Sequence, residues 1–277
     1  MAMSETKENE KSSSLQRGIQ ILRLLSDSPD QGLKLKEIAD ATHLPQATAH
    51  RILKQLETEN MVEQTQEGKN YRLTLDLFTM TAKAAGHSQF RQICRPSLLR
   101  LSGALNDTVF LMVRSGFDAV CVDRVDGSIP IRSLTGDVGG RVPLGMGQAA
   151  SIILALLPED ECEEVIRFNV PRLIHLDYID EAGLRFNVAH ARKSGYAIKQ
   201  GQGSLTEMSG VSVGITDRNG QVVGALSIGT LNERLNPDRL PHIVKMLQTE
   251  AAKISTLINP YDPALRRPLQ HLRSADT

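Results

Sequence analysis

Residues 35–73 read LKEIADATHLPQATAHRILKQLETENMVEQTQEGKNYRL, and this stretch decides the fold of the N-terminal part of the chain. It opens with a short amphipathic segment over residues 35–41, which predicts a helix. A tight turn at His43-Leu44-Pro45 follows, and Pro45 suits the first turn of a second helix that ends near Glu59-Asn60. Two helices joined by so short a turn are typical of a helix-turn-helix.

The flanking residues extend this motif on both sides. Residues 61–65 and 70–73 have strand-like composition and are separated by a turn over 66–69, which predicts a hairpin. Upstream, apolar residues from Leu15 to Leu25 recur at helical spacing, with Ser14 as the expected N-cap and Ser28-Pro29 as the stop. Three helices followed by one hairpin predict a winged helix-turn-helix domain over residues 14–74.

The second helix of the motif carries a polar face suited to DNA. Opposite its apolar residues it has no acidic side chain between Gln46 and Gln55. Gln can pair with adenine edges, Arg with guanine, and Thr with a thymine methyl group or a phosphate. Taken alone, this face could simply be solvated, but the turn and the hairpin favour DNA contact. The candidate DNA-binding residues are Lys36, Gln46, Ala47, Thr48, His50, Arg51, Lys54, Lys69 and Arg72, the last three and Arg51 being candidates for phosphate contacts.

The overall charge sets a condition on DNA binding. The 277 residues contain 32 Lys and Arg and 32 Asp and Glu, so the net charge is zero. Affinity must come from a local basic surface and from a homodimer that presents two motifs to a palindromic double-stranded operator, with a tetramer as the alternative. No segment has the length and apolarity of a signal peptide or a membrane span, so we expect a cytoplasmic protein without a membrane partner.

The remainder of the chain predicts a linker and a second domain. Residues 75–88 are expected to form a linker helix, and residues 1–13 and 259–277 are expected to be flexible. Between 89 and 258 we expect an α+β domain in which an antiparallel sheet is flanked by helices. Its expected strands are 108–113, 119–124, 129–133, 211–216 and 222–229, the last two joined by a hairpin turn at Asp217–Gly220. Its expected helices are 89–105, 147–157, 159–168, 180–194 and 237–257.

A ligand pocket is expected at the start of the helix that begins at Gly147. Free N–H groups at a helix start bind anions without a charged side chain. A packing turn with only a capping role is the alternative. The three cysteines (Cys94, Cys121 and Cys162) are far apart and are expected to be buried, and no cofactor or metal site is expected. The candidate effector-binding residues are Met146, Gly147, Gln148, Ser212, Val213, Ser227 and Gly229.

From about Ser14 to Ile258 the chain resembles the IclR family of bacterial transcription factors. The resemblance lies in SLQRGIQILRLLSD (14–27), GGRVPLGMGQAASIILALLPEDE (139–161) and KSGYAIKQGQGSLTEMSGVSVGITDRNGQVVGALSIG (193–229), together with the helix-turn-helix and the wing. It implies a winged-helix domain, a linker helix that helps dimerisation, and an effector domain resembling the GAF fold. Ser227 matches a family pocket position. Such proteins act as dimers or tetramers on catabolic genes, often those for aromatic or small organic acids.

Three departures from the common family pattern fall where the pocket is expected. Residues 145–151 read GMGQAAS instead of an HATALGK-like run, Lys199–Gln202 replaces a stretch that is often acidic, and the strand near Ser212–Ile215 lacks the usual Cys and Pro and appears short. The resemblance therefore carries over no effector identity.

The expected function is sequence-specific regulation of transcription, modulated by a small aromatic or carboxylic effector. A repressor of a catabolic operon is favoured, with an activator as the alternative. An enzyme is a rival hypothesis, although G-x-S-x-G, H-E-x-x-H and paired-His motifs are lacking. A winged helix that binds protein is another rival, and a steep salt dependence of DNA binding would argue against it.

Overall fold

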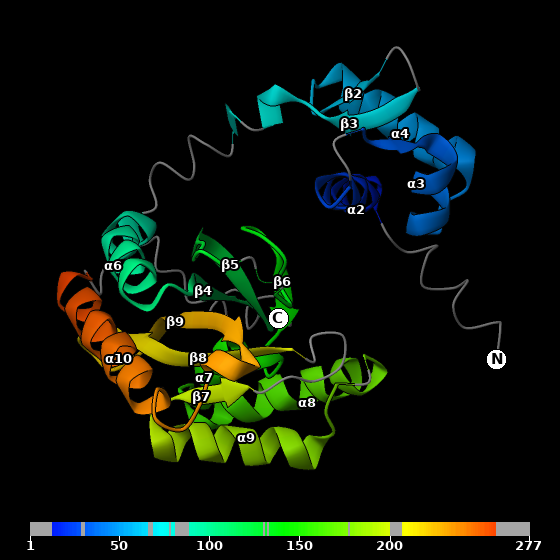
Figure 1. Cartoon of the computed structure of the whole chain (residues 1–277). Helices are drawn as coiled ribbons and strands as arrows, with labels where there is room; N and C mark the ends of the chain where they lie inside the picture. Colours follow the sequence, from blue (N-terminus) through cyan, green and yellow to red (C-terminus); the bar gives the residue numbers. More distant parts are fainter. Residues whose placement is uncertain are drawn as a thin grey trace. The chain divides into compact units, whose positions relative to one another are not determined.

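The computed structural model describes residues 13–28, 31–65, 69–77, 79–80, 89–129, 131, 133–176, 178–199 and 207–258. The chain forms two compact units, residues 1–87 and residues 88–277 (Figure 1). The described part of the predicted linker helix, residues 75–77 and 79–80, is helical. The rest of that prediction, and the two terminal segments 1–12 and 259–277, lie outside the described residues.

The first unit is a winged helix-turn-helix, as predicted. Its three antiparallel strands pair in the order β1-β3-β2, and the short strand β1 was not predicted from the sequence. Its elements are α2 (Ser14–Ser26), β1 (Leu33–Lys34), α3 (Leu35–Thr42), α4 (Gln46–Thr58), β2 (Val62–Gln64) and β3 (Asn70–Leu73).

Two helix starts in this unit differ from the predictions. The N-cap of α2 is Ser13 and not Ser14, because the Ser13 hydroxyl accepts the Gln16 N–H while the Gln16 side chain accepts the Ser13 N–H. Pro45 is the N-cap of α4 and lies just before its first turn. Asn60, at the predicted end of this helix, takes a left-handed conformation with φ of 54° and follows the last turn of α4.

The second unit contains a six-stranded antiparallel sheet in the order β6-β5-β4-β9-β8-β7. The α+β prediction is therefore confirmed. The hairpin predicted at Asp217–Gly220 joins the two longest strands. The strands are β4 (Thr108–Ser115), β5 (Asp118–Val125), β6 (Arg141–Pro143), β7 (Ala197–Lys199), β8 (Met208–Thr216) and β9 (Val222–Leu231).

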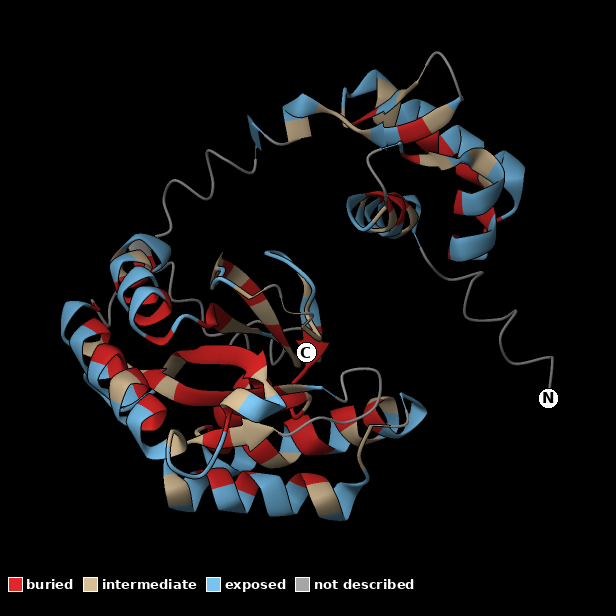
Figure 2. Ribbon diagram, viewed as in Figure 1, coloured by how far each residue is buried: buried red, intermediate tan, exposed pale blue. Residues whose placement is uncertain are grey.

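Helices cover both faces of this sheet, so the central strands β4 and β9 are buried along most of their length (Figures 1 and 2). On one face α6 (Gln89–Leu105) and α10 (Leu240–Leu257) pack on the odd-numbered residues of β4, such as Leu111. On the other face α7 packs on the even-numbered residues, such as Met112, and α8 and α9 pack against α7. These three helices are Gly147–Ala155, Glu159–His175 and Glu181–Ser194.

The edges of the sheet were predicted incorrectly. Residues 129, 131 and 133 belong to no strand, and the edge strand is instead β6, whose residue Val142 pairs with Ala119. Between them the chain turns back on itself, with the Gly136 N–H donating to Ser133 and the Gly140 N–H to Asp137. At the opposite edge, β7 is a three-residue strand that the sequence did not reveal. Edge strands this short leave too few alternating residues to be recognised.

Helix bounds also differ from the predictions. Helix α7 ends at Ala155 and not at residue 157, and α9 begins at Glu181 and not at residue 180. Helix α8 runs past Phe168 to His175, with Pro171 inside it. Helix α10 begins at Leu240 and not at Pro237, after a single 3-10 turn (Asn232–Arg234). The strand near Ser212 is nine residues long, so the expectation that it is short was wrong.

Candidate nucleic-acid interface and ligand cavity

Helix α4 presents its polar side chains as one exposed face. Ala49, Ile52 and Leu53 are buried against α2 and α3, which fixes the rotation of the helix. Ala47, Arg51 and Lys54 are therefore exposed on the opposite side, at the i, i+4 and i+7 spacing of one helix face. Gln46 and His50 are also exposed, whereas Thr48 is half-buried at the margin.

The turn before α4 is held rigidly. His43 has a left-handed backbone with φ of 54°, and the next residue, Leu44, is buried in the core. The buried Thr42 hydroxyl donates to the Ile38 carbonyl at 2.6 Å, which anchors the end of α3. These contacts fix the two helices relative to each other, as in other helix-turn-helix motifs.

Two of the predicted phosphate contacts are bound to carboxylates of the same domain. The Lys54 ammonium lies 2.6 Å from Glu57, and the Arg72 guanidinium lies 2.6 Å from Glu63 on the neighbouring strand. The hydrogen bond that Lys54 donates to Glu57 raises the pKa of Lys54. Glu57 is half-buried and the other three side chains are exposed, so each ion pair contributes little to the stability of the domain.

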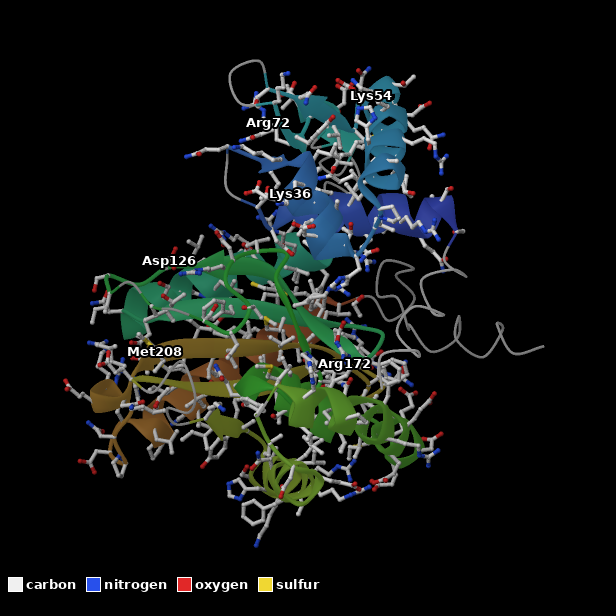
Figure 3. All side chains as sticks on the ribbon, turned by 90° about the vertical axis from the view of Figure 1, so that its right-hand side faces the viewer. Lys36, Lys54, Arg72, Asp126, Arg172 and Met208 are labelled. Carbon is white, nitrogen blue, oxygen red and sulfur yellow. The ribbon has the colours of Figure 1, made fainter. Side chains whose placement is uncertain are left out.

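The remaining predicted contacts come from other elements. Lys36 is exposed on α3, and Lys69 is exposed at the end of the wing turn, where its φ is 52°. Figure 3 shows Lys36, Lys54 and Arg72 on α3, α4 and β3 respectively. The basic groups are thus distributed over three elements of one small domain, with Arg51 on the exposed face of α4.

A cavity lies in the second unit between the start of α7 and the sheet. Its volume is about 70 Å³, several times the ~15 Å³ that one water molecule requires, so it has room for a small organic molecule. Its lining combines apolar side chains with hydroxyls and one ammonium group. The lining residues are Phe110, Met112, Ile131, Ser133, Leu134, Thr135, Val142, Met146, Gly147, Gln148, Ala149, Ala150, Lys199, Met208, Ser209, Gly210, Ser227 and Gly229.

Five of the seven predicted effector-binding residues line this cavity, namely Met146, Gly147, Gln148, Ser227 and Gly229. Ser212 and Val213 do not. The Ser212 hydroxyl is buried and donates to the Leu226 carbonyl at 2.8 Å. Val213 points to the opposite face of the sheet, into the core beneath α6 and α10.

The start of α7 presents backbone donors to the cavity. Gly147 has φ of 78°, and a Cβ there would lie 3.0 Å from Leu134, so this position favours glycine. Its N–H donates to the Tyr178 hydroxyl at 2.8 Å. The next two N–H groups, those of Gln148 and Ala149, have no acceptor among the described residues.

Side chains tie α7 to the sheet at the cavity wall. The Gln148 amide nitrogen donates to the Ser227 hydroxyl at 3.0 Å and lies 3.3 Å from the Ile228 carbonyl. Gly210 makes room for this crossing, because a Cβ at that position would lie 2.1 Å from the Gln148 amide nitrogen. Among the described residues, the proton of the Ser227 hydroxyl has no acceptor.

Lys199 and Tyr178 form a second polar group at the same end of the cavity. The Lys199 ammonium donates to the Tyr178 hydroxyl and lies 3.8 Å from the centre of its ring. Burial lowers the pKa of Lys199 to about 8 and raises that of Tyr178 to about 12. The sequence marked Lys199 as a departure from the family pattern but did not place it in the pocket.

The described residues give little support to a metal site, a reactive thiol or a membrane span. In that part of the chain no three His, Cys, Asp or Glu side chains are grouped so that they could hold a metal ion. Cys94, Cys121 and Cys162 are free and buried, as predicted, and burial raises the pKa of Cys94 to about 12. No described helix is both long enough and apolar enough to cross a bilayer.

A winged helix-turn-helix followed by an α+β domain with a ligand-sized cavity defines a DNA-binding regulator. The family described as "Bacterial transcriptional regulator IclR C-terminal" matches residues 82–256, and the "IclR helix-turn-helix domain" matches residues 14–66. The chain therefore belongs to the IclR family of bacterial transcriptional regulators. It is a regulator and not an enzyme.

Named relatives support this over nearly the full chain. The HTH-type transcriptional repressor AllR of Klebsiella pneumoniae is 28% identical over 245 residues, covering 88% of this chain and 89% of AllR. The HTH-type transcriptional regulator KipR of Bacillus subtilis (strain 168) is 26% identical, covering 90% of this chain and 98% of KipR.

Solved structures share the fold. An IclR transcriptional regulator from Alicyclobacillus acidocaldarius has a TM-score of 0.73 at 22% identity, covering 89% of this chain and 98% of that one. An IclR homologue from Microbacterium hydrocarbonoxydans, solved in complex with 4-hydroxybenzoate, has a TM-score of 0.72 at 24% identity, covering 88% of this chain and 98% of that one.

Proposed function

We propose that this protein binds a palindromic operator as a homodimer and that a small organic acid in the α7 cavity changes its affinity for DNA. Each of the three predicted segments has its own role. Residues 14–74 bind DNA, residues 75–88 link the two domains, and residues 89–258 bind the effector and oligomerise. A tetramer of two such dimers is the alternative assembly. A protein that acts on bacterial DNA works in the cytoplasm.

The exposed face of α4 supports the proposal that this protein binds DNA. Arg51 is the central residue, because it lies on that face with no acidic side chain on the first turn of the helix. One turn to either side of Arg51 lie Ala47 and Lys54, and beside it lie Gln46, Thr48 and His50. The DNA backbone would be contacted from neighbouring elements by Lys36, Lys69 and Arg72. One such domain with few basic groups binds weakly, which favours a dimer.

The cavity supports the proposal that this protein binds an effector. It is lined by apolar side chains, the hydroxyl of Ser227 and two backbone N–H groups that have no acceptor in the described part of the chain, which suits a small molecule with an acidic group. The 4-hydroxybenzoate complex of the Microbacterium hydrocarbonoxydans homologue supports an aromatic acid as one class of effector. The name of AllR, a repressor, supports repression as the sign of regulation, with activation as the alternative.

The test begins with selection of DNA sequences that bind the full-length protein, followed by binding titrations of Arg51→Ala. Loss of one bidentate contact to guanine costs about 1–3 kcal/mol, which is roughly 5- to 150-fold for each half-site. We expect Arg51→Ala to abolish operator binding while the circular dichroism spectrum and the melting temperature stay unchanged.

Lys245→Ala is the matched control, because it removes one exposed positive charge from α10 in the other unit. It should bind the operator as the wild-type protein does. Normal operator binding by Arg51→Ala would show that α4 is not the recognition helix. Failure of the selection to enrich any sequence would overturn the proposal as a whole.

A further inference from the structure

Lys199 places an ammonium group in the wall of the cavity. It is the last residue of the edge strand β7, and it is the only ionisable residue in the described lining. The described wall contains no carboxylate, so the net charge of that wall is positive. Burying a charged group in a largely apolar wall is costly, and burial lowers the pKa of Lys199 to about 8.

The position of the Lys199 ammonium is fixed by Tyr178. The ammonium lies over the phenol ring and donates to its hydroxyl, and the same hydroxyl accepts the N–H of Gly147. Tyr178 therefore connects the lysine to the first backbone N–H of α7. The next two N–H groups of that helix, from Gln148 and Ala149, have no acceptor among the described residues and belong to the same cavity wall.

This arrangement concentrates hydrogen-bond donors at one end of a small cavity. The ammonium contributes a charged donor, and the helix start adds two N–H groups with partial positive charge. The opposite part of the lining is apolar, with Phe110, Met112 and Ile131. Donors at one end and apolar side chains at the other match a carboxylate attached to a short apolar or aromatic group.

We propose that Lys199 is the residue that makes this cavity selective for anions: its ammonium, held by Tyr178, binds the carboxylate of the effector together with the N–H groups of Gln148 and Ala149. This inference rests on the proposed effector site and assigns to it a specificity-determining residue. Helix-start donors alone would accept a neutral carbonyl as well as a carboxylate. The lysine discriminates against the neutral ligand, because only the anion offsets the cost of keeping the ammonium charged within the wall.

The test compares each acid with its own amide, which has nearly the same shape and no charge. The probes are benzoate with benzamide, 4-hydroxybenzoate with 4-hydroxybenzamide, and propionate with propionamide, measured by calorimetry with the full-length protein at pH 7. We expect the wild-type protein to bind at least one acid about tenfold or more tightly than its amide. In Lys199→Gln the acid and its amide should bind with about equal affinity, and the affinity for the amide should stay that of the wild-type protein.

Two further variants separate charge from packing. Lys199→Arg keeps the charge and should keep the preference for the acid, while Tyr178→Phe keeps the ring but removes the hydroxyl and should weaken the preference in part. Lys193→Gln, an exposed lysine at the end of α9, is the matched control and should behave as the wild-type protein does.

Proton uptake provides a readout that a purely structural lysine would not give. Near pH 8.5, binding of a carboxylate should cause Lys199 to take up a proton. The apparent enthalpy of binding should then depend on the ionisation enthalpy of the buffer. Lys199→Gln should lose this dependence. Among the described residues, Tyr178 is a titratable group that contacts the ammonium directly. Because burial raises the pKa of Tyr178 to about 12, it stays neutral at this pH.

The proposal is overturned if Lys199→Gln keeps the wild-type preference for acid over amide, or if the wild-type protein binds no acid of the panel more tightly than its amide. Direct binding needs no DNA, so the outcome is distinguishable from failure of the proposed function. That function would fail separately, if an acid bound with a Lys199-dependent preference but left operator affinity unchanged.

Discussion

The amide nitrogen of Gln148 donates to the hydroxyl of Ser227 across 3.0 Å, joining the first turn of α7 to the centre of the sheet. Gln148 precedes Ser227 by 79 residues in the chain. The bond forms part of the cavity wall, and Gly210 on the neighbouring strand leaves the space through which the Gln148 side chain passes. A ligand in the cavity would therefore meet the helix and the sheet at the same time.

Substitutions at the cavity wall should remove the effector response and leave DNA binding intact. In Ser227→Leu a buried hydroxyl is replaced by a bulkier apolar group, which fills the cavity and removes one of the two acceptors of the Gln148 amide. Gly147→Val forces a β-branched residue into φ of 78° and brings its Cβ within about 3.0 Å of Leu134. Operator titrations with and without the effector acid check this. An unchanged ligand-induced shift in both variants would contradict the cavity assignment.

The ion pair of Lys54 with Glu57 should limit DNA affinity. Removing one phosphate contact in each protomer with Lys54→Ala should make the slope of log affinity against log salt less negative by about 2 for a dimer. Glu57→Gln removes the carboxylate that competes with phosphate for Lys54, so it should tighten binding at low salt. Affinity measured over a salt series tests both. If Lys54→Ala leaves the slope unchanged, this lysine does not contact phosphate.

Asp107 should be a major source of stability in the second unit. It is buried and accepts hydrogen bonds from the Thr230 hydroxyl at 2.6 Å, from Arg234 at 3.0 Å and from Arg239 at 2.6 Å. Asp107→Ala leaves two partly buried guanidinium groups uncompensated, so we expect a loss of about 3–5 kcal/mol in the free energy of unfolding. Urea denaturation measures this loss.

Asp126→Ala is the control for that experiment. Asp126 pairs with Arg124 but is 62% exposed, so its loss should cost less than about 1 kcal/mol. Equal effects of the two substitutions would show that the buried network contributes nothing beyond an ordinary surface ion pair.

Glu250 should make the second unit sensitive to acid. Burial alone would raise its pKa, but hydrogen bonds from Arg100 at 2.6 Å and Lys253 at 2.7 Å outweigh burial and lower the pKa to about 2. Because the pKa in the folded state lies below its ordinary value of 4.5, the carboxylate stabilises the fold above pH 4.5. This contribution is lost as the pH falls from 4.5 towards 2.

Glu250→Gln tests this dependence. The difference in unfolding free energy between wild-type protein and variant should be constant from neutral pH down to about 4.5 and should shrink below it. Denaturation at a series of pH values provides the measurement. A difference that stays constant down to pH 2 would show that the titrating group lies elsewhere.

The sequence by itself determined the elements that rest on local periodicity. Apolar spacing of 3.6 residues identified α4 and the rotation that exposes Arg51, because a helix is defined by residues three and four apart. The glycine at position 147 marked the start of α7, and the turn at Asp217–Gly220 marked the hairpin of β8 and β9. These features depend on neighbours in the chain, so they can be predicted from the sequence.

Only the tertiary structure decided which side chains meet. Ser212 and Ser227 face each other in the paired strands β8 and β9, yet only Ser227 reaches the cavity, because the Ser212 hydroxyl is turned to the Leu226 carbonyl. Lys199 enters the cavity wall because the short strand β7 pairs at the sheet edge, which its three residues could not reveal. Strand order and register join segments far apart in the chain, and local periodicity carries no information about either.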